Sequence, residues 1–352
     1  MPDTYTDFLL CSFGQASATN LSRLTDGHIS HDQVTRFLSA EVQTSAALWR
    51  QVKPLVRQVE NETGALVIDD SISEKPYTDE NDLICWHWDH SKNHNVKGIN
   101  FLTAIYQVPQ AVLPIAFDLV TKTELYTDPE TGKEKRRSVI SKNERFRMLL
   151  HIGQTNRRCF QYVLADHWFA SAGNMRYRQL TLNKDFVFPV KDNRKVALSE
   201  EEKQKKRYQG VKTLDLPEGA TRQVWLEDVP FPVLLVRQVF INKDGSTGEH
   251  YLVTSDLTLD WTPITQLYQR RWSIEPYHKS LKQNASLEKS PTRLEHTQRN
   301  HFFASVCAYV KLERLRLKTK LNHFALKGKL YVSALKAAHE EFVKLKSQLS
   351  TA

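Results

Sequence analysis

The sequence predicts a mixed α/β fold with a helical region at each end. Apolar runs at residues 65–68, 98–106 and 112–120 have the β-branched and aromatic composition of strands. A helical pattern at residues 141–154 and a further apolar run at 161–165 give the order strand, strand, strand, helix, strand. We therefore expect a mixed sheet flanked by helices, in which the first three strands form an antiparallel meander.

Residues 1–62 are expected to form a helical N-terminal region. Residues 21–58 repeat apolar side chains with helical spacing, and Gly27 supplies a turn between two short stretches. Ser30 and Gln33 match a capping box at the start of the second stretch, which carries Arg36. This pattern fits a helix-turn-helix that contacts DNA through Arg36, and it fits a small helical hairpin packed on the main domain equally well.

The rest of the chain divides into four segments. Residues 63–190 hold the first part of the α/β core, and residues 191–260 turn first strongly charged and then strand-rich, which predicts a β-rich insertion. Residues 261–290 return to a helical pattern that we assign to the core. Residues 291–352 form a helical C-terminal region with an apolar stripe that offers either core packing or a contact surface.

Composition favours a polyanionic partner and gives no sign of secretion. Lysine and arginine outnumber aspartate and glutamate by 49 to 40, for a formal charge of +9. The four cysteines are far apart and form no metal or redox motif; they are Cys11, Cys85, Cys159 and Cys307. The apolar run at residues 8–13 is too short to cross a bilayer and lacks a basic flank. We therefore expect a cytoplasmic protein with no membrane partner.

A charged helical stretch between residues 268 and 282 is the most informative motif. On a helix with about 100° per residue, four of its side chains fall within an arc of about 60°, and a fifth lies close by. These are Tyr268, Arg271, Glu275 and Lys282, with Lys279 beside them. A solvated face with ordinary charge pairing is the alternative interpretation. Pro276 cannot donate a backbone hydrogen bond, so we expect a kink or a helix restart there.

Two aspartates follow apolar strand-like runs. Asp70 comes after residues 66–68, and Asp166 comes after residues 163–165. A carboxylate at the end of an apolar strand is costly unless it has a partner or a function, although each residue could also be a turn or helix-capping residue. Together with Glu275, these carboxylates could hold two Mg²⁺ ions about 3.5–4 Å apart, as an in-line phosphoryl displacement requires. Mn²⁺ is a plausible substitute, and the loaded site is near neutral once a phosphodiester is bound.

The spacing Tyr268-x-x-Arg271-x-x-x-Glu275-x-x-x-x-x-x-Lys282 resembles the Y-R-E-K motif of DDE insertion-sequence transposases, which have a ribonuclease-H-like catalytic core. In that family the first aspartate follows a hydrophobic strand and precedes Ser or Thr, which selects Asp70 over Asp69. The second lies at the end of the fourth strand, as Asp166 does, and a β-rich insertion separates it from the glutamate helix. The resemblance extends over roughly residues 65–290.

The resemblance implies catalytic and metal-binding roles for Asp70, Asp166 and Glu275, and DNA contacts for Tyr268, Arg271, Lys279 and Lys282. It implies a bacterial, nucleoid-associated protein that binds the terminal inverted repeats of its own element as a homodimer, nicks the DNA with water and joins the freed 3′-hydroxyl to target DNA. The alternatives are a metal-dependent nuclease without strand transfer and a non-catalytic DNA-binding relic.

Other signals are weaker. The histidines and aspartate within residues 86–94 could suggest zinc, but a polar hairpin or loop is the preferred interpretation. The basic clusters at residues 133–137 and 203–207 fit solvated surface or phosphate contacts. The sequence has neither a G-x-x-x-x-G-K-[ST] loop nor a G-x-S-x-G elbow, which disfavours a nucleotide-driven machine and a serine hydrolase.

Overall fold

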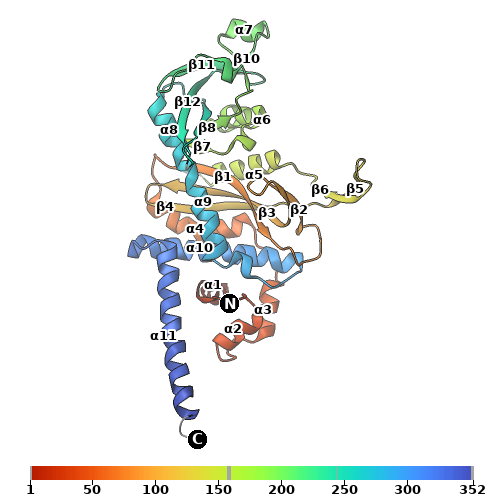
Figure 1. The fold of residues 1–352 in the computed structure, drawn as a ribbon, viewed down its shortest axis with the longest axis vertical. Helices are drawn as coiled ribbons and strands as arrows, with labels where there is room; N and C mark the ends of the chain where they lie inside the picture. Colours follow the sequence, from red (N-terminus) through yellow and green to blue (C-terminus); the bar gives the residue numbers. More distant parts are fainter. Residues whose placement is uncertain (1, 157–159, 243, 350–352) are drawn as a thin grey trace. The chain divides into compact units, whose positions relative to one another are not determined.

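The protein is described by a computed structural model that covers residues 2–156, 160–242 and 244–349 (Figure 1). The chain divides into two compact units. The first unit comprises residues 1–55, 73–99 and 277–352, and the second comprises residues 56–72 and 100–276. The second unit contains both predicted catalytic aspartates and the glutamate. Strands β1 (Ala65–Glu74) and β3 (His94–Val108) have residues in both units.

The second unit is built on a mixed sheet. Its strands follow the order β10-β9-β11-β12-β13-β8-β7-β1-β3, and β4 also pairs with β3. The strands not yet given bounds are β4 (Ala111–Leu119), β7 (Tyr162–Leu164), β8 (Asp185–Val190), β9 (Lys195–Ala197), β10 (Gln209–Gly210), β11 (Thr221–Leu226), β12 (Val233–Ile241) and β13 (Thr247–Thr254). β7 runs parallel to both of its neighbours, β1 and β8. β3 pairs antiparallel with β4, and every neighbouring pair in the series β8-β13-β12-β11-β9-β10 is antiparallel as well. This is the ribonuclease-H-like mixed sheet that the sequence predicts.

The predicted helix at residues 141–154 is α5 (Lys142–Thr155). It begins with the capping box of Ser141 and Glu144, which satisfies backbone N–H groups in its first turn. Gly153 lets α5 approach β1 closely, because a Cβ at this position would lie 3.0 Å from Leu66 Cδ2. Phe146 is fully buried and stacks on Phe169. Apolar burial therefore fixes α5 against the central strands.

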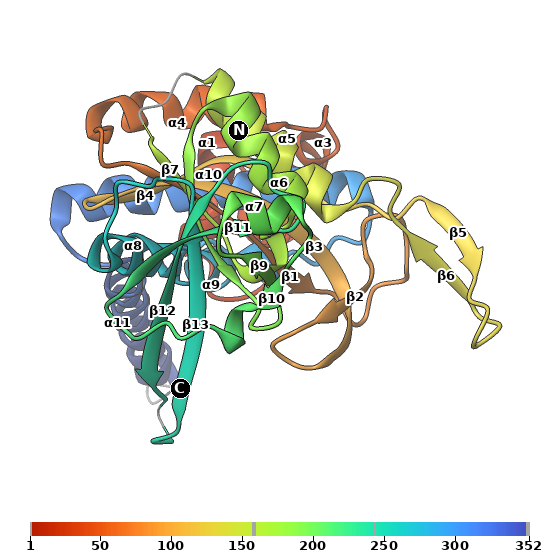
Figure 2. The same cartoon turned by 90° about the horizontal axis from the view of Figure 1, so that it is seen from above.

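The predicted β-rich insertion continues the central sheet. β13 pairs with the core strand β8, with Tyr251 opposite Val190, and β12 and β11 follow outward. A short helix, α7 (Glu200–Gln204), lies within this segment. A separate hairpin, formed by β5 (Glu124–Thr127) and β6 (Glu134–Arg137), extends away from the sheet of the same unit (Figure 2). The basic cluster at residues 133–137 is therefore largely strand β6.

The first unit is mainly helical. Its helices are α1 (Pro2–Cys11), α2 (Ala18–Leu24), α3 (His31–Leu38), most of α4 (Ser45–Val59), α10 (Glu295–Thr319) and α11 (His323–Leu349), together with most of α9 (Ile274–Gln283). Phe302, Val306, Tyr309 and Leu312 of α10 are buried in this unit, which makes the predicted apolar stripe part of a core. The turn between α2 and α3 contains Gly27 with a φ of 79°, and the Ser30–Gln33 capping box is present.

The structure also shows the polar hairpin that the sequence analysis prefers, and it adds helix α1 to the predicted helical N-terminal region. β2 (Cys85–Asp89) forms an antiparallel hairpin with residues 94–98 of β3, so the polar segment at 86–94 is a hairpin. α1 forms from the apolar run near the N-terminus. Cys11, Cys85 and Cys307 are free thiols, and Cys159 lies outside the described residues. In the described part of the chain, every helix is too short or too polar to cross a membrane.

Candidate functional site

Asp70 lies within strand β1, not at its end as the sequence analysis placed it. The strand continues to Glu74 because Ser71 to Glu74 keep an extended backbone. Asp70 Oδ2 accepts two hydrogen bonds, one from Asn100 Nδ2 at 2.8 Å and one from Lys142 Nζ at 2.7 Å. Its carboxylate is therefore held by an amide of β3 and a cation at the start of α5.

The neighbouring Asp69 makes different contacts. Successive residues of a strand point to opposite faces of the sheet, so Asp69 and Asp70 are directed to different sides of β1. Asp69 Oδ2 lies 3.4 Å from Arg271 Nη1, and both side chains are mostly buried, at 13% and 11% exposed. Burial, followed by the negative charges of Asp166 and Asp70, raises the pKa of Asp69 well above its ordinary value, and Arg271 opposes this shift.

Asp166 follows β7 closely, as predicted. β1 and β7 run parallel with Val67 opposite Leu164, so continuing this register by two residues brings Asp69 and Asp166 to the same level. Asp166 Oδ1 accepts a hydrogen bond from Trp168 N at 3.0 Å and caps the 3₁₀-helix His167–Phe169. Burial raises the pKa of Asp166; His167 opposes that shift and the charge of Asp70 adds to it. Asp69 and Asp166 therefore lie beside each other on adjacent parallel strands, and Asp70 is close enough for its charge to act on both. These three aspartates are called the acidic cluster below.

The stretch from Tyr268 to Lys282 is not a single helix. Helix α8 (Trp261–Gln269) ends after Tyr268, residues 270–273 form a 3₁₀ turn, and α9 begins at Ile274. Pro276 is the third residue of α9. Backbone N–H groups in the first turn of a helix have no intrahelical partner, so the proline costs no helical hydrogen bond there. The expected restart is therefore present, and it begins two residues before the proline.

Arg271 joins the motif to the acidic cluster despite this interruption. Its Nη1 lies 3.6 Å from Glu275 Oε1, in addition to the contact with Asp69, and its guanidinium lies 5.7 Å from the ring centre of Tyr268. Burial disfavours the charge on Arg271, but Tyr268 and the surrounding carboxylates, led by Asp69, outweigh this effect and raise its pKa. Glu275 is 50% exposed and reaches the cluster through Arg271.

The other predicted DNA-contact residues belong to the first unit. Lys279 Nζ lies 5.3 Å from the ring centre of Phe324, and Lys282 Nζ lies 3.8 Å from Glu288 Oε1. Arg36 is exposed on α3, and its Nε donates to the carbonyl of Asp32. Their roles toward DNA stay predictions.

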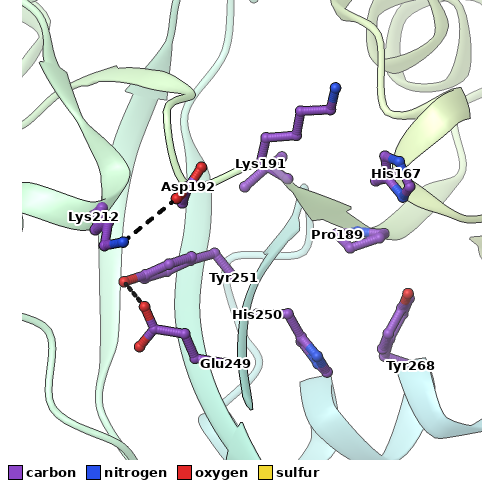
Figure 3. A pocket seen from close by; sticks show the side chains of 10 residues that line it. His167, Pro189, Lys191, Asp192, Lys212, Glu249, His250, Tyr251 and Tyr268 are labelled. Atoms are coloured by element: carbon purple, nitrogen blue, oxygen red, sulfur yellow. Dashed lines mark hydrogen bonds and ion pairs between the residues drawn. The ribbon is translucent and has the colours of Figure 1, made fainter. Parts of the chain in front are cut away.

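A pocket of about 470 Å³ lies beside Tyr268 in the second unit (Figure 3). It is lined by His167, residues 189–192, Lys212, residues 249–251 and Tyr268. The Lys212 ammonium lies 3.7 Å from Asp192 Oδ2, and Tyr251 donates to Glu249. Burial and the nearby charge of Arg271 lower the pKa of His250, which favours its neutral form.

Four polar residues of this region were missed by sequence reasoning: Asn100, Lys142, His167 and His250. His167 could have been noticed because it directly follows Asp166. The other three come from distant segments, β3, α5 and β13, and no local spacing connects them to the aspartates.

The carboxylate oxygens of the acidic cluster are suitable ligands for a divalent cation. Carboxylate oxygens are the ligands that Mg²⁺ and Mn²⁺ prefer, and a bound cation would offset both the burial and the neighbouring negative charge that raise the pKa of Asp69 and Asp166. Within residues 2–156, 160–242 and 244–349, no three acidic, histidine or cysteine side chains are already gathered around a common point, including the histidines of the β2–β3 hairpin. Lys142 and Arg271 stand among the carboxylates instead.

The mixed sheet and its acidic cluster define the class of protein: a ribonuclease-H-like fold with carboxylates on adjacent parallel strands. Residues 138–311 match the family described as "Transposase DDE domain". Residues 138–311, just under half of the chain, therefore carry a transposase DDE domain, which supports a DDE-class transposase. The matched region includes Asp166 and the whole stretch from Tyr268 to Lys282.

One solved structure similar to this chain is the Drosophila P element transposase strand transfer complex. The sequences are 14% identical, the TM-score is 0.26, and the similarity covers 51% of this chain and 36% of the other. The chain thus covers about a third of the length of that protein. No protein with curated annotation matched the sequence.

Proposed function

We propose that this protein cuts DNA at the terminal inverted repeats of its own element and joins the freed ends to target DNA. In the first step, water adds to a phosphorus atom and the bond to the 3′-oxygen breaks, leaving a 3′-hydroxyl. In the second step, that hydroxyl attacks a target phosphodiester and displaces the target's own 3′-oxygen. Atoms and charge balance without an oxidant or a nucleotide cofactor.

The observation that carries this proposal is the placement of the acidic cluster on adjacent strands within a chain that carries a DDE domain. We assign the metal ligands to Asp70, Asp166 and Glu275, the residues that match the family pattern. These residues would hold two divalent ions, Mg²⁺ or in its place Mn²⁺, which would supply activation of the attacking oxygen and stabilisation of the leaving oxygen. Without them, the repulsion among the carboxylates opposes the approach of a phosphodiester.

Tyr268 and Arg271 are assigned to the DNA phosphates. Burial raises the pKa of Tyr268, which keeps its phenol protonated and able to donate a hydrogen bond to a phosphate oxygen. Arg271 stays charged and presents a planar fork that suits phosphate geometry. The pocket beside Tyr268 adds Lys191 and Lys212, which fits a site that follows the DNA backbone. Lys279, Lys282 and, in the N-terminal region, Arg36 are assigned further DNA contacts.

Helix α11 supports a homodimer. Apolar or small residues repeat along it with alternating spacings of four and three, which is the heptad pattern of a coiled coil. They are Phe324, Gly328, Tyr331, Leu335, Ala338, Phe342 and Leu345. Beyond Tyr331 every described residue of the helix is exposed, and Leu335, Phe342 and Leu345 are 49%, 63% and 52% exposed. α11 extends away from α10 within the first unit (Figure 1).

Charge complementarity favours a second copy of the same helix in parallel orientation. In that arrangement a residue at heptad position g faces position e of the next heptad of the partner. Glu341 occupies g and Lys346 occupies the following e, so opposite charges meet twice across a symmetric pair. The exposed seam covers little more than two heptads, which suits a dimer that also needs DNA to become stable.

Cleavage of a labelled duplex carrying the element's own terminal repeat tests the function. With Mg²⁺ or Mn²⁺, the wild type is expected to nick at the repeat boundary, whereas Asp70→Ala, Asp166→Ala and Glu275→Ala bind but do not nick. Glu130→Ala is the matched control, because Glu130 is an exposed acid near the β5–β6 turn. Variants that cut normally would refute the site assignment.

The same assay separates the two alternative functions. A pre-nicked duplex with a free 3′-hydroxyl is mixed with unlabelled target DNA, and joined products are resolved by size. A transposase yields joined strands, a nuclease yields only hydrolysis, and a DNA-binding relic retains the duplex without cutting it.

A further inference from the structure

Lys142 holds an unusual position for a lysine. It is the first residue of α5, where the helix dipole disfavours a positive charge. The backbone at this point is well anchored, because the Ser141–Glu144 capping box closes the helix start and Arg145 Nη1 lies 2.5 Å from Asp118 Oδ2. Helix stability therefore does not explain a lysine here, and its contact with Asp70 does.

The ammonium of Lys142 and the amide of Asn100 contact the same oxygen of Asp70. Both groups donate to Oδ2, at 2.7 Å and 2.8 Å, and no described residue donates to Oδ1. Asn100 is fully buried on β3 and cannot move without disturbing the sheet. The Lys142 side chain is 28% exposed and has a flexible four-carbon stem, so only the lysine can leave Asp70 for solvent or for a phosphate.

The positive charge of Lys142 partly balances the negative charge of the acidic cluster. Asp70 adds to the negative charge that raises the pKa of Asp69 and Asp166, and a nearby ammonium offsets part of that repulsion. A divalent cation that binds Asp70 meets this ammonium as a like charge at close range. The lysine and the metal therefore compete for one carboxylate.

We propose that Lys142 is the counter-ion of Asp70 in the metal-free protein and must leave that carboxylate when a divalent cation binds. The proposal rests on the assignment of Asp70 as a metal ligand. DNA favours the exchange, because a phosphate near the site offers the released ammonium a new partner. Metal binding is consequently weak without DNA and strengthens with it, which limits cutting to the assembled complex. Asn100 keeps Asp70 oriented throughout.

Mn²⁺ titration of the DNA-free protein, followed by calorimetry or by the electron paramagnetic resonance of unbound Mn²⁺, tests this exchange. Lys142→Met is expected to bind Mn²⁺ about tenfold more tightly than the wild type, because a like charge has been removed. Lys133→Met is the control, since it loses the same charge at an exposed position near β6. Lys142→Gln is a second neutral variant, should the methionine variant fold poorly, and Lys142→Arg should retain weak binding.

A duplex with the terminal repeat provides a second measurement. Adding it should raise the Mn²⁺ affinity of the wild type more than that of Lys142→Met, because the variant has no ammonium to release. Unchanged or weaker Mn²⁺ binding by Lys142→Met would overturn the proposal and make Lys142 a positioning residue instead. If Asp70→Ala leaves Mn²⁺ binding unchanged, the proposed metal site itself is wrong, and this outcome is distinguishable from failure of the Lys142 exchange.

Discussion

Arg271 and Asp69 form a mostly buried ion pair, with 3.4 Å between Arg271 Nη1 and Asp69 Oδ2. The pair joins β1 to the turn between α8 and α9, two segments separated by about 200 positions in the chain. The two neighbouring aspartates have different cationic partners, because Asp69 pairs with the mostly buried Arg271 and Asp70 pairs with the more exposed Lys142. The adjacent aspartates therefore have different expected roles.

Asp69→Asn should lower protein stability but retain part of the cleavage activity, because it leaves Arg271 with one fewer anionic partner. The expected stability loss is about 1–3 kcal/mol, with residual cleavage at low temperature. Asp70→Asn should retain stability within about 1 kcal/mol and lose cleavage by at least about a thousandfold. Thermal unfolding and single-turnover cleavage of both variants give the comparison. The opposite pattern would assign the metal ligand to Asp69.

Arg271→Lys should reduce cleavage even though it preserves the charge. Lysine cannot present the planar fork that reaches Asp69, Glu275 and a phosphate from one position. We expect cleavage to fall by about 10- to 100-fold, with weaker binding of the terminal repeat at higher salt. Single-turnover rates and salt-dependent binding measure the two effects. Arg222→Lys on β11 is a control, and equal rates for Arg271→Lys and wild type would contradict the assigned role.

His301 should make the protein less stable in mild acid. It is fully buried; its Nδ1 lies 2.9 Å from the Tyr5 hydroxyl, and its Nε2 lies 3.0 Å from the Ser286 carbonyl. The neutral tautomer with a proton on Nε2 satisfies both contacts. Burial, assisted by the charge of Lys75, lowers the pKa of His301 from 6.5 to about 4.

The direction of the pH effect on stability follows from the lowered pKa of His301. Between pH 6.5 and about 4 the unfolded chain takes up a proton that the folded protein does not, so stability falls as the pH falls through this window. Across this window the free energy of unfolding should fall by about 3 kcal/mol. Denaturant unfolding at several pH values should show it, and His301→Gln should have a flatter pH dependence. An unchanged slope in His301→Gln would assign the acid sensitivity to other groups.

Phe342→Glu and Leu335→Glu should each weaken the dimer by at least about tenfold while leaving the fold intact, because both side chains are exposed in the single chain. Lys336→Glu alters charge next to Leu335 but outside the apolar seam, so it is the control. Sedimentation of the protein with and without the terminal-repeat duplex measures the association. Wild-type behaviour of both glutamate variants would exclude α11 as the contact surface.

Local patterns in the sequence were enough to predict the order of strands and helices in the core. Apolar runs gave β1, β3, β4 and β7, the strand-rich composition of the segment before residue 260 indicated further strands, and the Ser30 capping box marked one helix start. Helix capping and strand periodicity act over a few residues, which is why they can be read from spacing alone. The family resemblance added the three carboxylates of the proposed site.

The sequence by itself determined the α/β class and the strand order along the chain, and it predicts places for Asp166 and Glu275 in a DDE-type pattern. Only the tertiary structure decided that Asp70 lies inside β1, that a 3₁₀ turn divides the Tyr268–Lys282 stretch, and that Lys142 and Arg271 stand among the carboxylates. These contacts join segments far apart in sequence, and their geometry depends on strand register and helix packing rather than on the spacing of neighbouring residues.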